Sequence, residues 1–237
     1  MKLKSAIHIF REKQGFVLVI LLAGLGLFFA AFPRLRASLN HIPVDTAIGR
    51  LNDRKALKLA KIPELIEITR ASLDLNDNAG YWSDLSTLQY KQANQEGEFS
   101  SAGKASLVEA KRAVEQSLMR SPGNAFLWYR LSVIMAFQQA RPEAIVEALL
   151  MSLMTGPHEP GFMLNRLMFC LMFFSSFNPD DLSLLIAQVI AVWNMSDKEF
   201  VKMIRQDDEY LDNIRTLLKN SRPQMFEEMV TAVEKTG

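Results

Sequence analysis

The pattern of hydrophobic and polar positions divides this chain into one long apolar run near its start and a longer series of amphipathic segments. Residues 14–33 carry no charged side chain, whereas Lys13 stands immediately before them and Arg34 immediately after. A helix rises about 1.5 Å per residue, so this run reaches about 30 Å, the thickness of a bilayer's hydrocarbon core. The run therefore predicts a transmembrane anchor over residues 14–33, preceded by a basic cytoplasmic tail over residues 1–13.

Two other interpretations of the apolar run are weaker. A cleaved signal peptide has an apolar region of about 7–15 residues and a cleavage site with small residues. The run from Phe16 to Phe32 is longer, and the sequence from Ala30 to Pro33 is a poor cleavage site. A buried helix of a soluble core would normally show a polar face, and this run has none. The membrane anchor is therefore the favoured interpretation.

The charges on either side of the apolar run predict its orientation. Cytoplasmic flanks of transmembrane helices carry an excess of Lys and Arg. Four basic residues precede the run and three follow it within a short distance, namely Lys2, Lys4, Arg11 and Lys13 before it and Arg34, Arg36 and Arg50 after it. This small excess and the short N-terminal tail favour a bacterial inner-membrane protein whose C-terminal domain is periplasmic. The opposite orientation stays open because the two flanks nearly balance.

The segments after the anchor predict an all-α protein. Residues 34–50 contain Pro43 and Gly49 and little periodicity, which indicates a juxtamembrane linker. Residues 51–237 form about nine or ten helical segments with no alternation typical of strands. Pro63 fits the first turn of a new helix, as does Pro179 after Asn178. The apolar stretch 167–177 is too short to cross a bilayer and predicts a buried helix.

An internal repeat lies within residues 101–160. The sequences SLMRSP at 117–122 and SLMTGP at 152–157 are identical at four of six positions and lie 35 residues apart. That spacing is close to the roughly 34 residues of a tetratricopeptide repeat. Six positions resemble the signature of this repeat family: Pro122, Asn124, Trp128, Leu131, Ala144 and Pro157. Ser132 and Met135 depart from it. The resemblance implies a TPR-like α-solenoid of antiparallel helix pairs over residues 51–237.

Charge and motifs argue against several classes of function. The residues after position 33 include 23 basic and 25 acidic side chains, so the domain lacks the basic excess expected of a nucleic-acid-binding protein. The chain has no glycine-rich phosphate loop and no G-x-S-x-G motif. The three histidines, His8, His41 and His158, show no metal-ligand spacing with Cys170. We therefore predict no catalytic residue, cofactor or metal, and a protein that is not an enzyme.

The remaining chemical groups have simpler structural interpretations. Cys170 lies within an apolar stretch and predicts a small buried core residue. The acidic pairs at 180–181 and 207–209 stand where helices could start, because carboxylates favour the N-terminal end of the helix dipole. Five methionines at helical spacing favour core packing over a peptide-binding groove: Met151, Met154, Met163, Met168 and Met172.

These observations predict a membrane-anchored interaction scaffold. The order of anchor, degenerate repeat, and the segments Ser121–Ala125, Trp128 and Thr155–Pro160 is similar to small inner-membrane proteins of bacterial exopolysaccharide gene clusters, the VpsP-like proteins. That resemblance implies an accessory role in polysaccharide synthesis or export, with other membrane or envelope proteins as partners. Two alternatives stay open. One is an assembly factor for another envelope complex, and the other is a carbohydrate-processing enzyme, which would need facing carboxylates.

Overall fold

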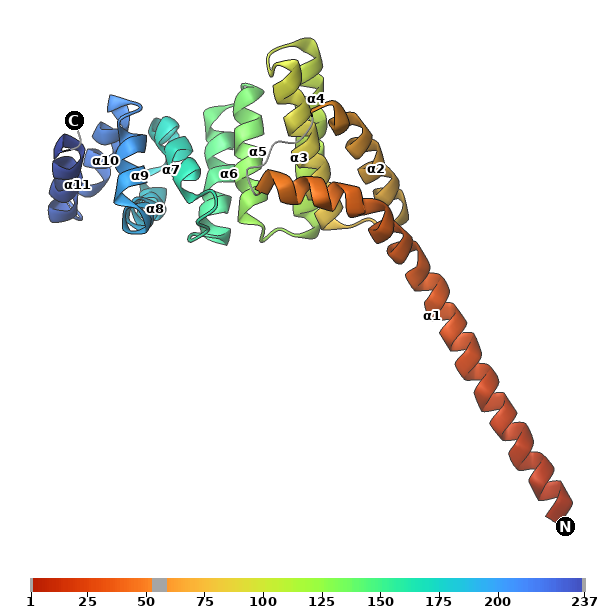
Figure 1. Ribbon diagram of the computed structural model, residues 1–237. Coiled ribbons are helices and arrows are strands. Elements are labelled where there is room, and N and C mark those ends of the chain that lie inside the picture. Colours follow the sequence, from red (N-terminus) through yellow and green to blue (C-terminus); the bar gives the residue numbers. More distant parts are fainter. Residues whose placement is uncertain (1, 53–58, 236–237) are drawn as a thin grey trace. The chain divides into compact units, whose positions relative to one another are not determined.

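A computed structural model describes residues 2–52 and 59–235, and the side chains of residues 20–51 and 60–235 (Figure 1). Every regular element in these ranges is a helix, with eleven α-helices and three short 3-10 helices. The all-α fold class is thereby confirmed. The chain separates into two compact units, residues 1–84 and residues 85–237.

The first unit contains the long helix α1, which spans Lys2–Asn52 and lies in two environments. From residue 20 to residue 36 every side chain except Pro33 is exposed, including Leu27 at 72% and Phe29 at 66%. From residue 37 onward, Ala37, His41 and Val44 are fully buried at helical spacing. This stripe forms where α1 packs against α2, so the helix changes from an exposed rod to a core element.

The prediction of a linker over residues 34–50 is wrong, because these residues continue α1. Two prolines, Pro33 and Pro43, lie inside the helix. A proline removes one backbone hydrogen bond and kinks a helix without necessarily ending it. Figure 1 shows that α1 changes direction in its second half. Tertiary packing of the buried stripe supplies the stability that local propensity lacks here.

The rest of the first unit consists of η1 (Leu59–Lys61), α2 (Ile62–Leu75) and the start of α3 (Ala79–Glu96). Pro63 lies in the first turn of α2, as its position in the sequence predicts. The turn between α2 and α3 is closed by side chains. The Asn78 carboxamide oxygen accepts the amide of Gly80 at 2.7 Å, and Trp82 Nε1 donates to Asp77 at 2.6 Å.

The second unit continues α3 and adds helices that follow one another in space as in sequence (Figure 1). Their bounds are α4 Ser101–Arg120, α5 Ala125–Phe137, α6 Pro142–Thr155, α7 Met163–Met172, η2 Phe174–Ser176, η3 Pro179–Asp181, α8 Leu182–Met195, α9 Asp197–Ile204, α10 Asp208–Leu218 and α11 Pro223–Lys235. Ten α-helices thus follow α1 among the described residues, and α7 is too short to cross a bilayer.

Two apolar clusters form the core of the second unit. One joins α4, α5 and α6 around Leu107, Leu127 and Ile134, and the other joins α6 to α11 around Leu167 and Phe200. Cys170 is fully buried in the second cluster, which confirms its predicted structural position. The wide apolar faces that meet in these clusters explain why short helices suffice to build the unit.

The expected packing of the methionines is correct only in part. Met163 is buried, but Met154 is 64% exposed and Met172 is 55% exposed. The spacing in the sequence predicted that all five methionines lie in the core. In the structure, Met154 on α6 and Met172 on α7 lie at the surface instead.

Serine side chains cap two of the helices. Ser196 is the N-cap of α9 and its hydroxyl accepts the amide of Glu199 at 3.3 Å. Ser100 is the N-cap of α4 and accepts the amide of Gly103. Asn178 precedes the 3-10 turn η3 and makes no capping bond with its side chain, so α8 begins only at Leu182.

Candidate functional site

The six repeat-signature residues lie along α5, α6 and their connecting turns. Asn124 is the N-cap of α5, where its carboxamide oxygen accepts the amide of Leu127 at 3.2 Å. Trp128 Nε1 donates to the carbonyl oxygen of Pro122 at 2.7 Å and so fixes the turn that precedes the helix. Leu131 is buried in the core, Ala144 is half-buried on α6, and Pro157 lies exposed in the turn after α6.

Helices α5 and α6 run antiparallel, because the C-terminal end of α6 contacts the N-terminal end of α5. Ser152 Oγ donates to the carbonyl oxygen of Ala125 at 2.7 Å. A Cβ atom placed on Gly156 would lie 2.6 Å from the Cβ atom of Ala125. The backbone segments at the end of α6 and the start of α5 therefore approach too closely for any larger residue at position 156. The glycine of SLMTGP, the second copy of the repeated sequence, is therefore required by this crossing.

A fully buried arginine, Arg166 on α7, closes the C-terminal end of α6. Its Nη1 donates to the carbonyl oxygens of Ser152 and Gly156 at 2.7 and 2.9 Å. Its Nη2 donates to the carbonyl oxygen of Pro157 at 3.0 Å and to Gln188 Oε1 at 2.5 Å. The last carbonyl groups of a helix lack intrahelical partners and carry partial negative charge. Arg166 satisfies them and holds the segment 152–157 in place.

Aromatic side chains extend this arrangement toward the surface of the second unit. The guanidinium of Arg166 lies 5.1 Å from the ring centroid of Phe162, which stacks on Tyr129 at 5.5 Å. Phe162 also contacts Phe126, and the guanidinium of Arg130 lies 4.4 Å from the Phe126 ring. Desolvation raises the pKa of Tyr129 to about 12. These contacts order the turn that contains residues 155–160.

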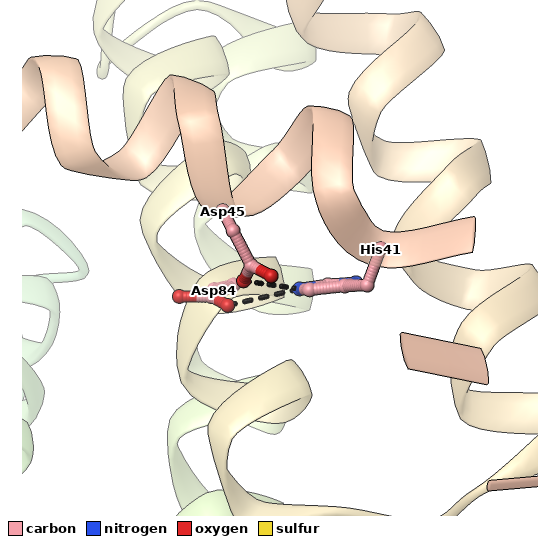
Figure 2. Close-up of side chains that lie close together, drawn as sticks. All are labelled: His41, Asp45 and Asp84. Carbon is pink, nitrogen blue, oxygen red and sulfur yellow. Dashed lines mark hydrogen bonds and ion pairs between the residues drawn. The ribbon is translucent and has the colours of Figure 1, made fainter. Parts of the chain in front are cut away.

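Three titratable side chains meet in the first unit, and Figure 2 shows them pointing toward one another. His41 and Asp45 lie one turn apart on α1, and Asp84 comes from α3. His41 Nε2 lies 3.0 Å from Asp84 Oδ2 and 3.8 Å from Asp45 Oδ1. The side chain of His41 is fully buried, that of Asp84 is 20% exposed and that of Asp45 is 65% exposed. A buried imidazole therefore faces two carboxylates at the molecular surface.

The imidazole of His41 is held in a fixed plane. The Tyr81 ring lies 4.1 Å from it between centroids, with 32° between the planes, and the Tyr81 hydroxyl is 3.3 Å from Ser38 Oγ. His41 Nδ1 is buried without a hydrogen-bond partner among the described residues. The sequence carries a signal for two of the three residues, since His41 and Asp45 have the four-residue spacing that places side chains on one helix face. Nothing local to α1 indicates Asp84, which lies 43 residues from His41.

A surface groove of about 570 Å³ lies on α4 and the end of α5. Its lining combines basic, apolar and amide groups: Lys104, Val108, Lys111, Arg112, Glu115, Phe137, Gln138 and Gln139. The Lys111 ammonium lies 3.1 Å from the Glu115 carboxylate, which offsets part of the positive charge.

The other residues considered for chemistry lie apart from the His41 cluster. Asp207 caps α10 by accepting the amide of Glu209 at 3.0 Å, as expected of an acid at a helix start. Asp180 and Asp181 form the 3-10 turn before α8. His158 is exposed in the turn after α6, and the side chain of His8 lies outside the described residues. Cys170 is buried on α7, and burial raises the pKa of its thiol to about 12.

One helix among the described residues, α1, is long and apolar enough to span a membrane. The fold therefore defines a helical protein with one candidate membrane span close to its N-terminus. The sequence matches no protein-family model and no curated protein.

Proposed function

We propose that this protein is a single-pass membrane protein in which α1 anchors a non-catalytic helical scaffold. The observation that carries this proposal is the change of environment along α1. The side chains of residues 20–32 are exposed and apolar, whereas the four turns from residue 37 onward bury a continuous stripe against α2. Water does not favour so long an exposed apolar rod, but a bilayer does.

The scaffold would be a TPR-like solenoid centred on residues 101–160. The antiparallel crossing of α5 and α6, the cap at Asn124 and the tryptophan-to-turn bond from Trp128 to Pro122 support this arrangement. Stacked helix pairs of this kind expose an extended surface that binds partner proteins. The partners would be other membrane or envelope proteins.

The setting that we propose is a bacterial inner membrane, with the domain in the periplasm and an accessory role in exopolysaccharide synthesis or export. Support for the orientation is the excess of basic residues before the apolar run. Support for the polysaccharide role is the resemblance of Ser121–Ala125 and Thr155–Pro160 to the VpsP-like proteins. These residues form caps and turns, so the resemblance transfers no active site.

The anchor is tested by extracting membranes with alkaline carbonate. The wild-type chain should stay in the membrane pellet, and the variant Leu25→Arg/Phe28→Arg should move to the soluble fraction, because each central charge costs about 3 kcal/mol in a membrane helix. Val108→Arg places a charge on an exposed position of α4 and serves as the control, with no expected release. Release of the wild-type chain by carbonate would contradict the anchor.

The scaffold role is tested by affinity purification of the intact chain from its native membranes after brief crosslinking. Envelope proteins of polysaccharide synthesis should be recovered, and an unrelated single-pass anchor should not recover them. Recovery of another envelope complex would favour the assembly-factor alternative. A periplasm-dependent reporter fused after Gly237 should be active, and activity of a cytoplasm-dependent reporter would reverse the orientation.

A further inference from the structure

We propose that His41, Asp45 and Asp84 form a binding site for one divalent transition-metal cation, with Zn²⁺ as the best match. This site does not depend on the proposed scaffold role. The cation would connect the packed half of α1 to the start of α3, because His41 and Asp45 come from α1 and Asp84 comes from α3. The site lies entirely within the first unit.

The spacing of the donor atoms fits a tetrahedral cation. Zinc binds imidazole nitrogen and carboxylate oxygen at about 2.0–2.2 Å, so two ligands of a tetrahedral site lie about 3.4 Å apart. The two distances from His41 Nε2 are 3.0 Å to Asp84 and 3.8 Å to Asp45, on either side of that value. The three donors all lie within 4.8 Å of one another. Shifts of about 0.4 Å would bring the two distances from His41 Nε2 to that value.

The donor set selects the class of cation. Imidazole favours zinc and its neighbours among the transition metals, whereas Mg²⁺ and Ca²⁺ prefer ligands that are all oxygen. Two carboxylates and one neutral imidazole balance a charge of +2. Three protein ligands leave one position for water or a partner's side chain, as in open zinc sites.

The surroundings of His41 prepare Nε2 for this role. Stacking of Tyr81 fixes the ring plane, so little rotamer entropy would be lost on binding. In the metal-free chain Nε2 donates its proton to the Asp84 carboxylate at 3.0 Å. A bound cation would replace that proton, and the ring proton would then lie on Nδ1, which is buried without a partner among the described residues.

Asp45 distinguishes a metal site from a purely structural ion pair. The 3.0 Å contact between His41 and Asp84 can exist as a hydrogen bond without any third group. Asp45 is 65% exposed and its Oδ1 lies 3.8 Å from His41 Nε2, which is too far for a hydrogen bond. As part of an ion pair alone, Asp45 should therefore contribute almost nothing to stability. As a ligand of a cation, it should contribute to binding as much as either of the other two ligands.

The experiment uses the full chain in detergent, stripped of metal with a chelator and titrated with ZnCl₂ by calorimetry. Wild type should bind one Zn²⁺ per chain, and its melting temperature should rise with zinc concentration. Asp45→Asn should weaken zinc binding at least about tenfold, because a charged ligand is lost, while its melting temperature without zinc stays unchanged. Asp74→Asn removes a carboxylate from α2 in the same unit and should bind as wild type does.

A second measurement reports on coordination directly. Co²⁺ added to the wild-type chain should give the visible absorption bands of a four- or five-coordinate ion, and Asp45→Asn should lose them. Equal zinc affinity of wild type and Asp45→Asn, or a stoichiometry that differs from one, would overturn the proposal. Stronger binding of Mg²⁺ than of Zn²⁺ would overturn the choice of cation.

Discussion

Among the described residues each compact unit buries one basic side chain, and the two side chains find different kinds of partner. Arg166 in the second unit is surrounded by the carbonyl oxygens of Ser152, Gly156 and Pro157 and by the amide oxygen of Gln188. His41 in the first unit faces two carboxylates, Asp84 and Asp45, at the edge of the structure. Arg166 is surrounded by backbone and amide dipoles in the interior, whereas His41 faces carboxylates near water.

The difference shows what each site can do. Arg166 carries a permanent charge, and its two terminal nitrogens donate to carbonyl and amide oxygens, while its Nε is buried without a partner among the described residues. Burial lowers its pKa, but an arginine side chain still remains charged in proteins. This arrangement, which joins α7 to the end of α6, suits a structural tie. The His41 cluster places two carboxylates around one imidazole near water, which suits the binding of a cation.

The largest expected effect is the loss of the Arg166 tie. Arg166→Met should destabilise the second unit by about 3–5 kcal/mol, because the segment 152–157 would keep buried carbonyl groups without donors. Arg166→Lys keeps the charge but loses the planar fork, so it should cost about half as much. Chemical denaturation gives both values, and hydrogen exchange should quicken first at the end of α6. Equal stability of all three chains would remove Arg166 from this role.

A smaller effect is expected at the His41 cluster in the absence of metal. Asp84→Leu should destabilise the first unit by about 1–3 kcal/mol, because the buried His41 Nε2 loses its hydrogen-bond partner. Asp84→Asn retains an acceptor oxygen and should cost less. Hydrogen exchange of α2 and of residues 37–51 measures the change in chelator-treated protein. A leucine variant as stable as wild type would mean that this contact contributes nothing.

A still smaller loss of stability is expected when the N-cap of α5 at Asn124 is removed. Asn124→Ala should lower the free energy of unfolding of the second unit by about 1 kcal/mol, the usual value for an N-cap. Asn124→Asp keeps the acceptor and should be close to neutral. Urea titration followed by far-ultraviolet circular dichroism measures both variants. A loss as large for aspartate as for alanine would show that the capping oxygen is not responsible.

The smallest effect at neutral pH concerns Cys170. Burial raises the pKa of this thiol from an ordinary 9.0 to about 12, against the opposing charge of Arg166. The folded state therefore gains stability that is complete below pH 9 and is lost as the pH rises toward 12. Native protein should resist alkylation at pH 8.5, whereas urea-unfolded protein should react at once. Rapid labelling of the native chain would contradict a buried thiol.

The sequence alone determined the features that depend on local chemistry and composition. The uncharged run from residue 14 to residue 33 and the helical periodicity after it predicted the all-α class, and the prolines at 63 and 157 marked the start of α2 and the turn after α6. Burial of Cys170 followed from its apolar neighbours. These signals are local. The length of an apolar run, the residues at helix ends and the spacing of apolar side chains all depend on residues within a few helical turns of one another.

Only the tertiary structure decided how distant residues meet. The stripe through Ala37 and Val44 continues α1 past two prolines because α2 covers it, and no window of residues 34–50 carries that information. Nothing in the sequence distinguishes Arg166 from other charged residues on short helices, and only the structure shows that the end of α6 surrounds it. The partner of His41, Asp84, lies 43 residues away in the sequence. Long-range pairing depends on the path of the chain, so the candidate site appears only when α1 and α3 are packed together.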